Sequence, residues 1–261
     1  MTDTLFTVYL ALVGAAIGSF LNVCLYRWPE GESVIRPRSR CPGCATSIPW
    51  YDNVPVLSWL VLRGRCRTCG EKISIQYPAV ELTVALIWLG TALWLGPGLE
   101  AVRGAIFLTL LLGIAIIDGK HQIIPDQFSL GGAALGLALA AWPEGFPFST
   151  AAFGAVAGYG FMWTIKLGGE ALLKKPALGL GDIHMMAMIG AFLGVGGALL
   201  TVFLGSALGL LIGVPLAWLQ GKLEAMGTYL PLGTFLAMGA TVAYLWGEPL
   251  IRWYMSYAFP T

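Results

Sequence analysis

Long apolar stretches recur from one end of this sequence to the other, separated by short polar segments. As helices, stretches of about 20 apolar residues cross the hydrocarbon core of a bilayer. Charged residues make up only 11% of the 261 positions and hydrophobic residues 57%, whereas a soluble domain carries about 25% charged residues. The sequence therefore predicts an all-α polytopic membrane protein.

Hydropathy predicts about eight transmembrane helices, and the 35 glycines agree with helices that pack closely in a membrane. The predicted spans are residues 5–26, 78–95, 101–118, 127–142, 149–167, 183–195, 197–219 and 232–248. Gly194, Gly196 and Gly197 separate the sixth span from the seventh and mark either a turn or a kink. The first span is too long for the apolar core of a cleavable signal peptide, and no basic segment precedes it.

The chain divides into a first transmembrane helix at 1–26, a polar loop at 27–77 and a transmembrane bundle at 78–261. Lys and Arg are concentrated in the cytoplasmic loops of membrane proteins. With the spans above, only Arg103 and Arg252 fall on one side of the membrane. The remaining basic residues fall on the side of the loop: Arg27, Arg36, Arg38, Arg40, Arg63, Arg65, Arg67, Lys72, Lys120, Lys166, Lys174, Lys175 and Lys222. We therefore expect the loop to be cytoplasmic and both termini to face outward.

The net charge is +1, and no basic stripe interleaved with aromatic residues occurs outside this loop. Nucleic acid is therefore not expected as a partner. The lipid bilayer is the partner that the composition implies.

Two aspartates differ from most other acidic residues because they lie at the ends of predicted spans. Asp118 ends the third span and Asp182 opens the sixth, so both are expected at the cytoplasmic surface. Two carboxylates that meet at one depth share a proton, because like charges in close contact do not both ionise readily. The ionised carboxylate can take a proton from an attacking water, while the protonated one polarises a peptide carbonyl. We expect Asp118 to be the acid, because a helix C-terminus disfavours negative charge and the helix N-terminus at Asp182 favours it.

Gly179 and Gly181 precede Asp182 and leave the backbone open to close approach by an extended substrate. The alternative for Asp182 is a helix N-cap, with the glycines as a linker. For Asp126, which follows Pro125 at the start of the fourth span, an N-cap is the expected role.

Four cysteines of the loop, Cys41, Cys44, Cys66 and Cys69, form two CxxC pairs with 21 residues between them. Four thiolates at this spacing suit a tetrahedral zinc ion, with two ligands from each CxxC turn. Disulfides are rare in the cytoplasm, so structural zinc is preferred, and four free thiols are the alternative. Cys24 lies within the first span and is expected to pack against neighbouring helices.

The motifs around these residues resemble those of one family. The run Gly179-Leu180-Gly181-Asp182 matches the GxGD motif of intramembrane aspartyl proteases. Residues 117–126 are similar to the segment around the first catalytic aspartate of prepilin peptidases. Further blocks similar to that family are residues 18–23 with Arg27 and Pro29, Tyr77-Pro78 with Glu81, and residues 231–235. The resemblance covers nearly the whole chain, with one departure: many relatives carry a lysine where this chain has His184.

The resemblance implies a membrane aspartyl endopeptidase in which Asp118 and Asp182 are catalytic. It implies cleavage of the leader peptides of type IV prepilins or type II secretion pseudopilins, at the cytoplasmic face of the bacterial inner membrane. It also implies N-methylation of the new N-terminal residue with S-adenosyl-L-methionine. Because many relatives lack the four cysteines, zinc is not expected to take part in proteolysis.

Polar residues near the loop are candidates for binding S-adenosylmethionine: Asn22, Arg27 and Glu81. Glu81 lies within a predicted span, where acidic residues are commonly functional. Alternatively, Asn22 bridges two helices, Arg27 extends toward the membrane surface, and Glu81 pairs with Arg27.

Three other functions agree with parts of this pattern. A peptidase without methylation needs only the two aspartates. A transporter would use the acids for ion coupling, but it would more often place them near the middle of the membrane and show inverted repeats, which are not evident here. A zinc-binding scaffold for pilus assembly would leave the paired aspartates unexplained.

Overall fold

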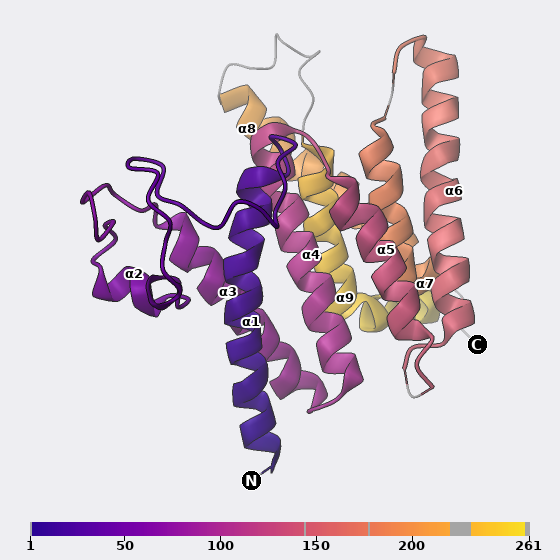
Figure 1. Cartoon of the computed structure of the whole chain (residues 1–261). Coiled ribbons are helices and arrows are strands. Elements are labelled where there is room, and N and C mark those ends of the chain that lie inside the picture. The colour runs from indigo at the N-terminus through magenta and orange to yellow at the C-terminus, as the bar shows by residue number, and fades with distance from the viewer. Residues whose placement is uncertain (1, 144, 177, 220–230, 259–261) are drawn as a thin grey trace. The chain divides into compact units, whose positions relative to one another are not determined.

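The computed structural model describes residues 2–143, 145–176, 178–219 and 231–258. Over these residues the chain is helical, apart from loops that contain two isolated antiparallel β-bridges (Figure 1). It divides into two compact units, residues 1–109 and 110–261. The prediction of an all-α protein is confirmed for the described residues.

The first unit is built on two long helices, α1 (Thr2–Arg27) and α3 (Gln76–Leu95), which pack against each other. Gly18 of α1 allows this close packing, because a Cβ placed there would lie 2.8 Å from Glu81 Cα of α3. The start of α4 (Leu99–His121) joins the same unit, where Trp88 Nε1 of α3 donates a hydrogen bond to Thr109 Oγ1 at 3.2 Å. Small residues and internally paired polar groups thus hold these apolar helices together, as is typical of membrane helices.

The loop between α1 and α3 has two short helical elements, the 3₁₀-helix η1 (Trp50–Asp52) and α2 (Leu57–Val61). The rest of the loop is irregular and contains the four cysteines. This irregular segment lies between the first two long helices, α1 and α3.

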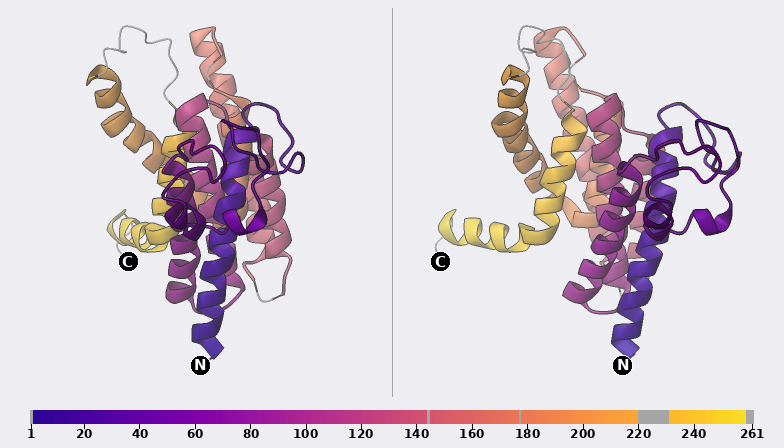
Figure 2. Two further views of the ribbon diagram at one scale, coloured as in Figure 1. Left: turned by 60° about the vertical axis from the view of Figure 1, so that its left-hand side comes forward. Right: turned by 90° about the vertical axis from the view of Figure 1, so that its left-hand side faces the viewer.

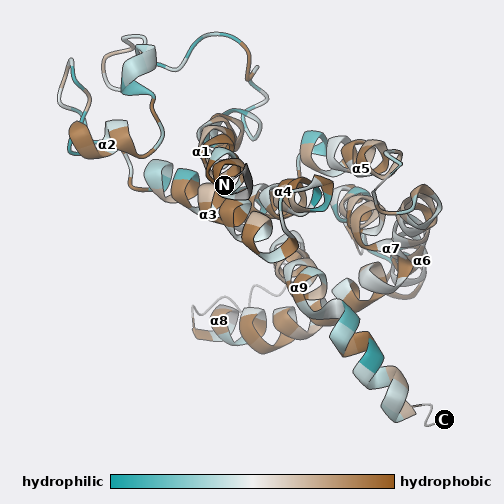
Figure 3. Ribbon diagram, turned by 90° about the horizontal axis from the view of Figure 1, so that it is seen from below, coloured by the Kyte–Doolittle hydropathy of each residue, from teal (hydrophilic) through white to brown (hydrophobic). Residues whose placement is uncertain are grey.

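The second unit is a helical bundle that the end of α4 opens. Its further elements are α5 (Asp126–Ala140), α6 (Phe148–Leu173), α7 (Leu180–Leu208), the π-helical η2 (Gly209–Gly213), α8 (Val214–Leu219) and α9 (Leu232–Ala258). The helix α7 packs against α5, α6 and α9, and its side chains Met185, Met186, Met188 and Ile189 are fully buried. Apolar residues occur all along the helices of the bundle (Figure 3), and several of them are exposed, among them Phe153, Val156 and Leu199.

The helix α7 reverses direction at Gly194, whose φ of 70° and ψ of −175° are not helical. Met186 and Ala198 lie on opposite sides of this residue, yet both contact Gly158 of α6. Twelve residues of a straight helix would separate them by about 18 Å, so the two halves of α7 fold back on each other. The glycines between the sixth and seventh predicted spans therefore mark a turn rather than a kink.

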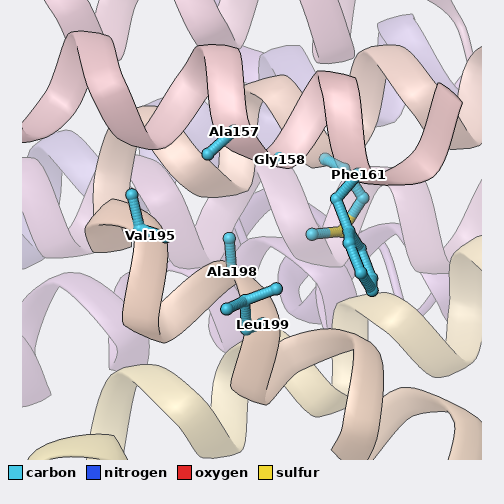
Figure 4. Close-up of a pocket in the computed structure, with 7 residues that line it drawn as sticks. Ala157, Gly158, Phe161, Val195, Ala198 and Leu199 are labelled. Carbon is cyan, nitrogen blue, oxygen red and sulfur yellow. The ribbon is translucent and has the colours of Figure 1, made fainter. Parts of the chain in front are cut away.

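A small pocket lies where α6 meets both halves of α7 (Figure 4). Its lining is apolar and includes Ala157 and Phe161 of α6 and Val195 and Leu199 of α7. No titratable group faces it, so it offers no catalytic chemistry.

Four described segments are long and apolar enough to cross a membrane: Thr4–Arg27, Gln76–Leu95, Leu99–His121 and Leu180–Leu216. The prediction of about eight spans is thus supported only in part. The helix α5 has 15 residues, fewer than the roughly 20 that a perpendicular helix needs. Lys222, which contributed to the predicted orientation, lies outside the described residues.

The helix α9 bends in its C-terminal part (Figure 2). Pro249 lies inside this helix, and proline bends helices because its ring clashes with the preceding turn and it lacks an N–H donor. The buried positions of α9 end at Gly247, although Ile251 beyond it still lies close to Gly196 of α7.

Candidate active site and cysteine cluster

Asp118 lies in the last turn of α4 and is 5% exposed. Its Oδ2 accepts hydrogen bonds from the backbone N–H of Thr234 at 2.7 Å and the Thr234 hydroxyl at 3.0 Å. The same hydroxyl lies 3.2 Å from the carbonyl oxygen of Ala115. One carboxylate oxygen is therefore held by α9, and Oδ1 is the oxygen left for chemistry.

Thr234 is a site residue that the sequence did not single out. It belongs to the block at residues 231–235 that resembles the prepilin peptidase family, but nothing in that block shows that its threonine contacts an aspartate 116 residues earlier. The signal available was the position of a polar hydroxyl at the start of an apolar helix, on the same predicted side as Asp118.

Asp182 lies in the first turn of α7, which begins after the N-cap residue Gly179. Its Oδ2 would lie 3.1 Å from a Cβ placed on Gly179, so the carboxylate folds back over the helix start. The alternative of Asp182 as the N-cap is wrong, because Gly179 occupies that position.

Gly181 and Gly233 are both in close contact with Ile124 in the segment between α4 and α5. A Cβ on Gly181 would lie 2.9 Å from Ile124 Cβ, and one on Gly233 would lie 2.6 Å from Ile124 Cδ1. The space beside Gly181 is therefore filled by this side chain. The expectation that Gly181 leaves an opening for substrate is replaced by a packing role, which brings the starts of α7 and α9 to the segment that follows Asp118.

The two aspartates lie near each other at one end of the second unit, because Ile124 contacts both Gly233, which lies against Asp118, and Gly181, which precedes Asp182. Both carboxylates also face helix N-termini, Asp118 that of α9 and Asp182 that of α7. At Asp118 the N-terminus of α9 opposes the C-terminus of α4, whereas Asp182 faces a helix N-terminus alone. The assignment of Asp118 as the acid therefore stays a prediction.

Asp126 does not cap α5. The N-cap of that helix is Pro125, with no side-chain capping bond, and Asp126 Oδ1 instead lies 2.8 Å from His184 Nδ1. The predicted capping role is therefore wrong, and His184, which stands where many relatives carry a lysine, makes a polar contact within the bundle. The ring of His184 also stacks on Tyr159 of α6, with centroids 6.2 Å apart and planes 14° apart.

The four loop cysteines come together in the first unit. Their sulfur atoms all lie within 4.8 Å of one another, and Cys41 Sγ lies 3.7 Å from Cys69 Sγ. Zinc–sulfur bonds of about 2.3 Å in a tetrahedron separate the sulfurs by about 3.8 Å. The donor set and its spacing therefore fit a tetrahedral zinc ion. All four cysteines are free of disulfides.

The two CxxC turns have the same backbone pattern, 25 residues apart. Cys41 N–H donates to Thr46 O and Cys66 N–H donates to Glu71 O, at 3.0 and 2.8 Å. Each turn is closed by one antiparallel bridge, Arg40 to Ser47 in the first and Arg65 to Lys72 in the second. The loop thus contains a repeated knuckle.

Backbone amides and hydroxyls favour the metal-binding form of two of these thiols. The amide N–H groups of Cys69 and Thr68 lower the pKa of Cys66 to about 6. The hydroxyl and amide of Thr46 lower the pKa of Cys44. Thiolates are the form that binds zinc, so the fold prepares these sulfurs as ligands.

An ion pair ties the loop together. Arg67, between the second pair of cysteines, donates to both carboxylate oxygens of Asp52 at 2.8 and 2.6 Å. These hydrogen bonds lower the pKa of Asp52. The bidentate geometry connects η1 to the second knuckle.

Asn22, Arg27 and Glu81 all contact the loop or its junction with α3. Asn22 Nδ2 donates to Tyr77 O at 3.0 Å, and the Arg27 guanidinium donates to Ser33 O and Pro37 O at 2.9 and 2.8 Å. Glu81 Oε2 accepts the N–H of Val56 at 2.7 Å. Arg27 therefore binds carbonyl oxygens of the loop. These contacts differ from both alternatives expected for Arg27, extension toward the membrane surface and pairing with Glu81.

Comparison with known proteins finds one family model for each of the two units of the chain. The Bacterial Peptidase A24 N-terminal domain matches residues 12–95, and the Type IV leader peptidase family matches residues 105–214. A prepilin leader peptidase/N-methyltransferase from Pseudomonas putida is 35% identical over 96% of this chain and 94% of its own length. The chain belongs to the type IV leader peptidase family.

Other members of the type IV leader peptidase family are similarly close. The prepilin leader peptidase/N-methyltransferase of Myxococcus xanthus is 39% identical over 84% of this chain, which spans 65% of that protein. The protein of the same name from Aeromonas salmonicida is 33% identical over 94% of this chain and 92% of its own length. No solved structure matches the chain.

Proposed function

We propose that this chain is a membrane aspartyl endopeptidase that removes the leader peptide of type IV prepilins or type II secretion pseudopilins. The observation that carries the proposal is that Asp118 and Asp182, 64 residues apart in sequence, lie on either side of Ile124 at one end of the helical bundle. Relatives that cover nearly the whole chain are named prepilin leader peptidases. We assign Asp118 and Asp182 as the catalytic pair.

In the proposed reaction the dyad holds one proton between two carboxylates, because like charges in contact do not both ionise readily. The ionised carboxylate removes a proton from water as the water attacks the scissile carbonyl. The protonated carboxylate donates a hydrogen bond to the carbonyl oxygen and later gives its proton to the leaving amine. Thr234 holds Oδ2 of Asp118, so Oδ1 is the oxygen that we assign to proton transfer.

We also propose that the chain methylates the new N-terminal amine with S-adenosylmethionine, as the names of its relatives state for those proteins. The predicted binding residues Asn22, Arg27 and Glu81 are buried and form hydrogen bonds to the protein itself. Their contacts favour a role in shaping the loop around that site over direct binding of the methyl donor. A peptidase without methylation is the alternative.

The four cysteines are proposed to hold one structural zinc ion, which would supply a rigid tetrahedral centre to the loop and take no part in proteolysis. Their sulfur spacing supports this assignment. Metal analysis of the purified protein should give about one zinc per chain. A zinc content near zero, in protein that retains its fold, would contradict it.

For the membrane we propose about eight spans in the bacterial inner membrane, with the loop cytoplasmic. The reversal at Gly194 supports two spans within residues 180–219, and the distribution of Lys and Arg supports the orientation. Both catalytic aspartates then lie at the cytoplasmic surface, where a prepilin leader would be.

The test is cleavage of a co-expressed prepilin by membranes that contain the wild type, Asp118→Asn or Asp182→Asn. Each single substitution should abolish cleavage while the protein remains folded, and the wild-type product should carry the added mass of one methyl group. If either variant cuts at nearly the wild-type rate, that aspartate is not catalytic. If cleavage occurs without the methyl mass, the peptidase assignment stands and the methyltransferase assignment fails.

A further inference from the structure

The short helix α2 exposes apolar side chains although it lies within the polar loop. Leu57, Leu60 and Val61 are 60%, 58% and 75% exposed. The other side of the helix faces the loop, where Trp59 Nε1 donates to Ile73 O at 3.1 Å. The helix therefore has an inner side held by the protein and an outer side of bare aliphatic groups.

The position of α2 along α1 and α3 indicates which medium surrounds its exposed side. Val56, the residue before α2, donates its N–H to Glu81. Glu81 lies opposite Gly18 of α1, nine residues before the end of that helix at Arg27. At 1.5 Å per residue this is about 13 Å below the end of α1. Figures 1 and 2 accordingly show α2 beside α1 and α3 and not beyond their ends.

Both α1 and α3 are long and apolar enough to cross a bilayer. A segment about 13 Å below the end of such a helix lies in the zone where headgroups give way to acyl chains, since amphipathic helices at a membrane surface bury their apolar face about 5–10 Å deep. Leu82 and Leu86 of α3 are exposed at similar or greater depth. Water is therefore not the expected surrounding of Leu60 and Val61.

We propose that α2 is an interfacial helix embedded in the phospholipid bilayer, with Leu57, Leu60 and Val61 in contact with acyl chains. Arg63 and Arg65 follow directly and are exposed, so their aliphatic stems can lie on the lipid while their guanidinium groups bind headgroup phosphates. The loop is thereby anchored in the membrane as well as tied to α1 and α3. Its knuckles are held close to the surface where a membrane-bound substrate arrives.

Phospholipid is favoured over a protein partner for two reasons. Three aliphatic side chains provide much less than the roughly 800 Å² per partner that a stable protein interface buries. An apolar turn followed by exposed arginines matches the order of acyl chains and phosphates in a leaflet. The Arg67 guanidinium is already paired with Asp52 and is not counted among these lipid-binding groups.

The test measures which medium surrounds α2 in the full-length protein in phospholipid nanodiscs. An environment-sensitive fluorescent amino acid is incorporated at Leu60 or, in a second variant, at Val61. The matched control is the same label at Ile35, an aliphatic position of the same loop that is 82% exposed. Ile35 lies between Ser33 and Pro37, which are held at the end of α1 by Arg27. Zinc content and elution as a single species show that each labelled protein is folded.

We expect lipids with a quencher on the upper acyl chain to reduce the emission at Leu60 and Val61 much more than at Ile35. Iodide in the water should reduce the emission at Ile35 more. If both α2 labels respond as Ile35 does, α2 lies in water and the proposal is overturned. If both α2 labels are shielded from lipid and iodide alike, a protein surface covers them, which also overturns it. No step depends on cleavage, so the result is independent of the proposed peptidase function.

Discussion

His184 Nδ1 lies 2.8 Å from Asp126 Oδ1, and this contact joins the N-terminal part of α7 to the first residue of α5. Asp182 lies two residues before His184 in sequence. Asp126 comes directly after the segment that links α4, which carries Asp118, to α5. The pair therefore connects the two chain segments that carry the proposed dyad. Its contribution to folding is small because Asp126 is largely exposed, so its main effect should be on the position of the dyad.

Replacement of His184 by Ala should lower kcat for prepilin cleavage, by up to roughly 100-fold if the dyad shifts by about 1 Å. His184→Lys should retain most of the activity, because an ammonium group can donate to Asp126 in place of the imidazole. Asp126→Asn should have a smaller effect than Asp126→Ala, since the amide oxygen can still accept. Steady-state cleavage with each variant measures this, and full activity in both alanine variants would contradict the positioning role.

Thr234→Val should lower kcat by about 10-fold, because a hydrogen bond to a charged group contributes about 1.5–3 kcal/mol and the backbone N–H of residue 234 still donates. Thr234→Ser should retain activity. Thr241→Val provides the control, since Thr241 lies on the same helix with its hydroxyl bonded to Ala237 O. An equal decrease of kcat in Thr241→Val would show that such substitutions damage α9 in general. The hydroxyl of Thr234 would then have no specific role at Asp118.

The convergence of Asp118 and Asp182 could be predicted from sequence because it follows from two one-dimensional properties. Hydropathy places each aspartate at a span end, and counting spans places both ends on one side of the membrane. The cysteine cluster was equally accessible, since CxxC spacing alone determines which sulfurs can share a metal. These predictions need no knowledge of how the helices are arranged around one another.

The partners of Asp126, Thr234 and Glu81 could not be predicted in the same way, because each bond depends on which helices are neighbours. Asp126 has a sequence context typical of an N-cap, but His184 of α7 lies within hydrogen-bonding distance and takes its carboxylate. Glu81 was expected at a cofactor or paired with Arg27, and nothing in the sequence indicated that its Oε2 accepts the N–H of Val56. Helix neighbours are set by three-dimensional packing, to which a single sequence gives no direct access.

The two zinc knuckles differ at one equivalent position, and the difference should appear in stability. Ala45 and Gly70 both have positive φ, 58° and 75°, and their amides donate to Cys41 O and Cys66 O. An L-residue in this conformation costs about 1–2 kcal/mol relative to glycine, which is partly offset by the greater freedom of glycine in the unfolded chain. Ala45→Gly should therefore stabilise the loop slightly, and Gly70→Ala should destabilise it by about 1 kcal/mol.

Zinc retention against a competing chelator, measured for both variants, tests this pair. Gly70 has open space around its Cβ position, so a loss in Gly70→Ala comes from backbone strain and not from a clash. Equal retention in wild type and both variants would show that the two turns are not strained as the backbone angles indicate.

The Asp52–Arg67 pair should make the loop sensitive to acid. Because the hydrogen bonds from Arg67 lower the pKa of Asp52, the folded state binds the proton of this carboxyl less readily than the unfolded state does. The stabilisation is fully present above the unfolded pKa of about 3.9. It is lost as the pH falls through the lower folded value.

Asp52→Asn should thus be less stable than the wild type at neutral pH, and the difference should shrink progressively as the pH falls below about 4. Limited proteolysis of the loop at a series of pH values measures this difference in stability. Because acid affects the thiolates of both proteins equally, that effect cancels when the two are compared. A difference that is constant down to the lowest pH would mean that the Asp52 charge does not contribute.

The close packing of α6 against α7 helps to position Asp182. One substitution should test this packing apart from the helix propensity of the residue that is introduced. A Cβ on Gly154 of α6 would overlap the carbonyl oxygen of Gly190 and lie 2.7 Å from Gly194 Cα. These are backbone atoms at the reversal of α7, so they cannot move aside as a flexible side chain could. Gly154→Ala should therefore destabilise the bundle by about 1–3 kcal/mol, the range typical of overpacking, and lower cleavage.

Gly160→Ala is the matched control on the same helix, because nothing lies within 4 Å of its Cβ position. Alanine is favoured over glycine within a helix by about 1 kcal/mol, so this variant should be as stable as the wild type or more stable. Thermal unfolding in detergent, followed with the cleavage rate, compares the two. If both variants behave alike, the α6–α7 contact at Gly154 is looser than the structure shows, and Asp182 must be positioned chiefly by Ile124 and the start of α7.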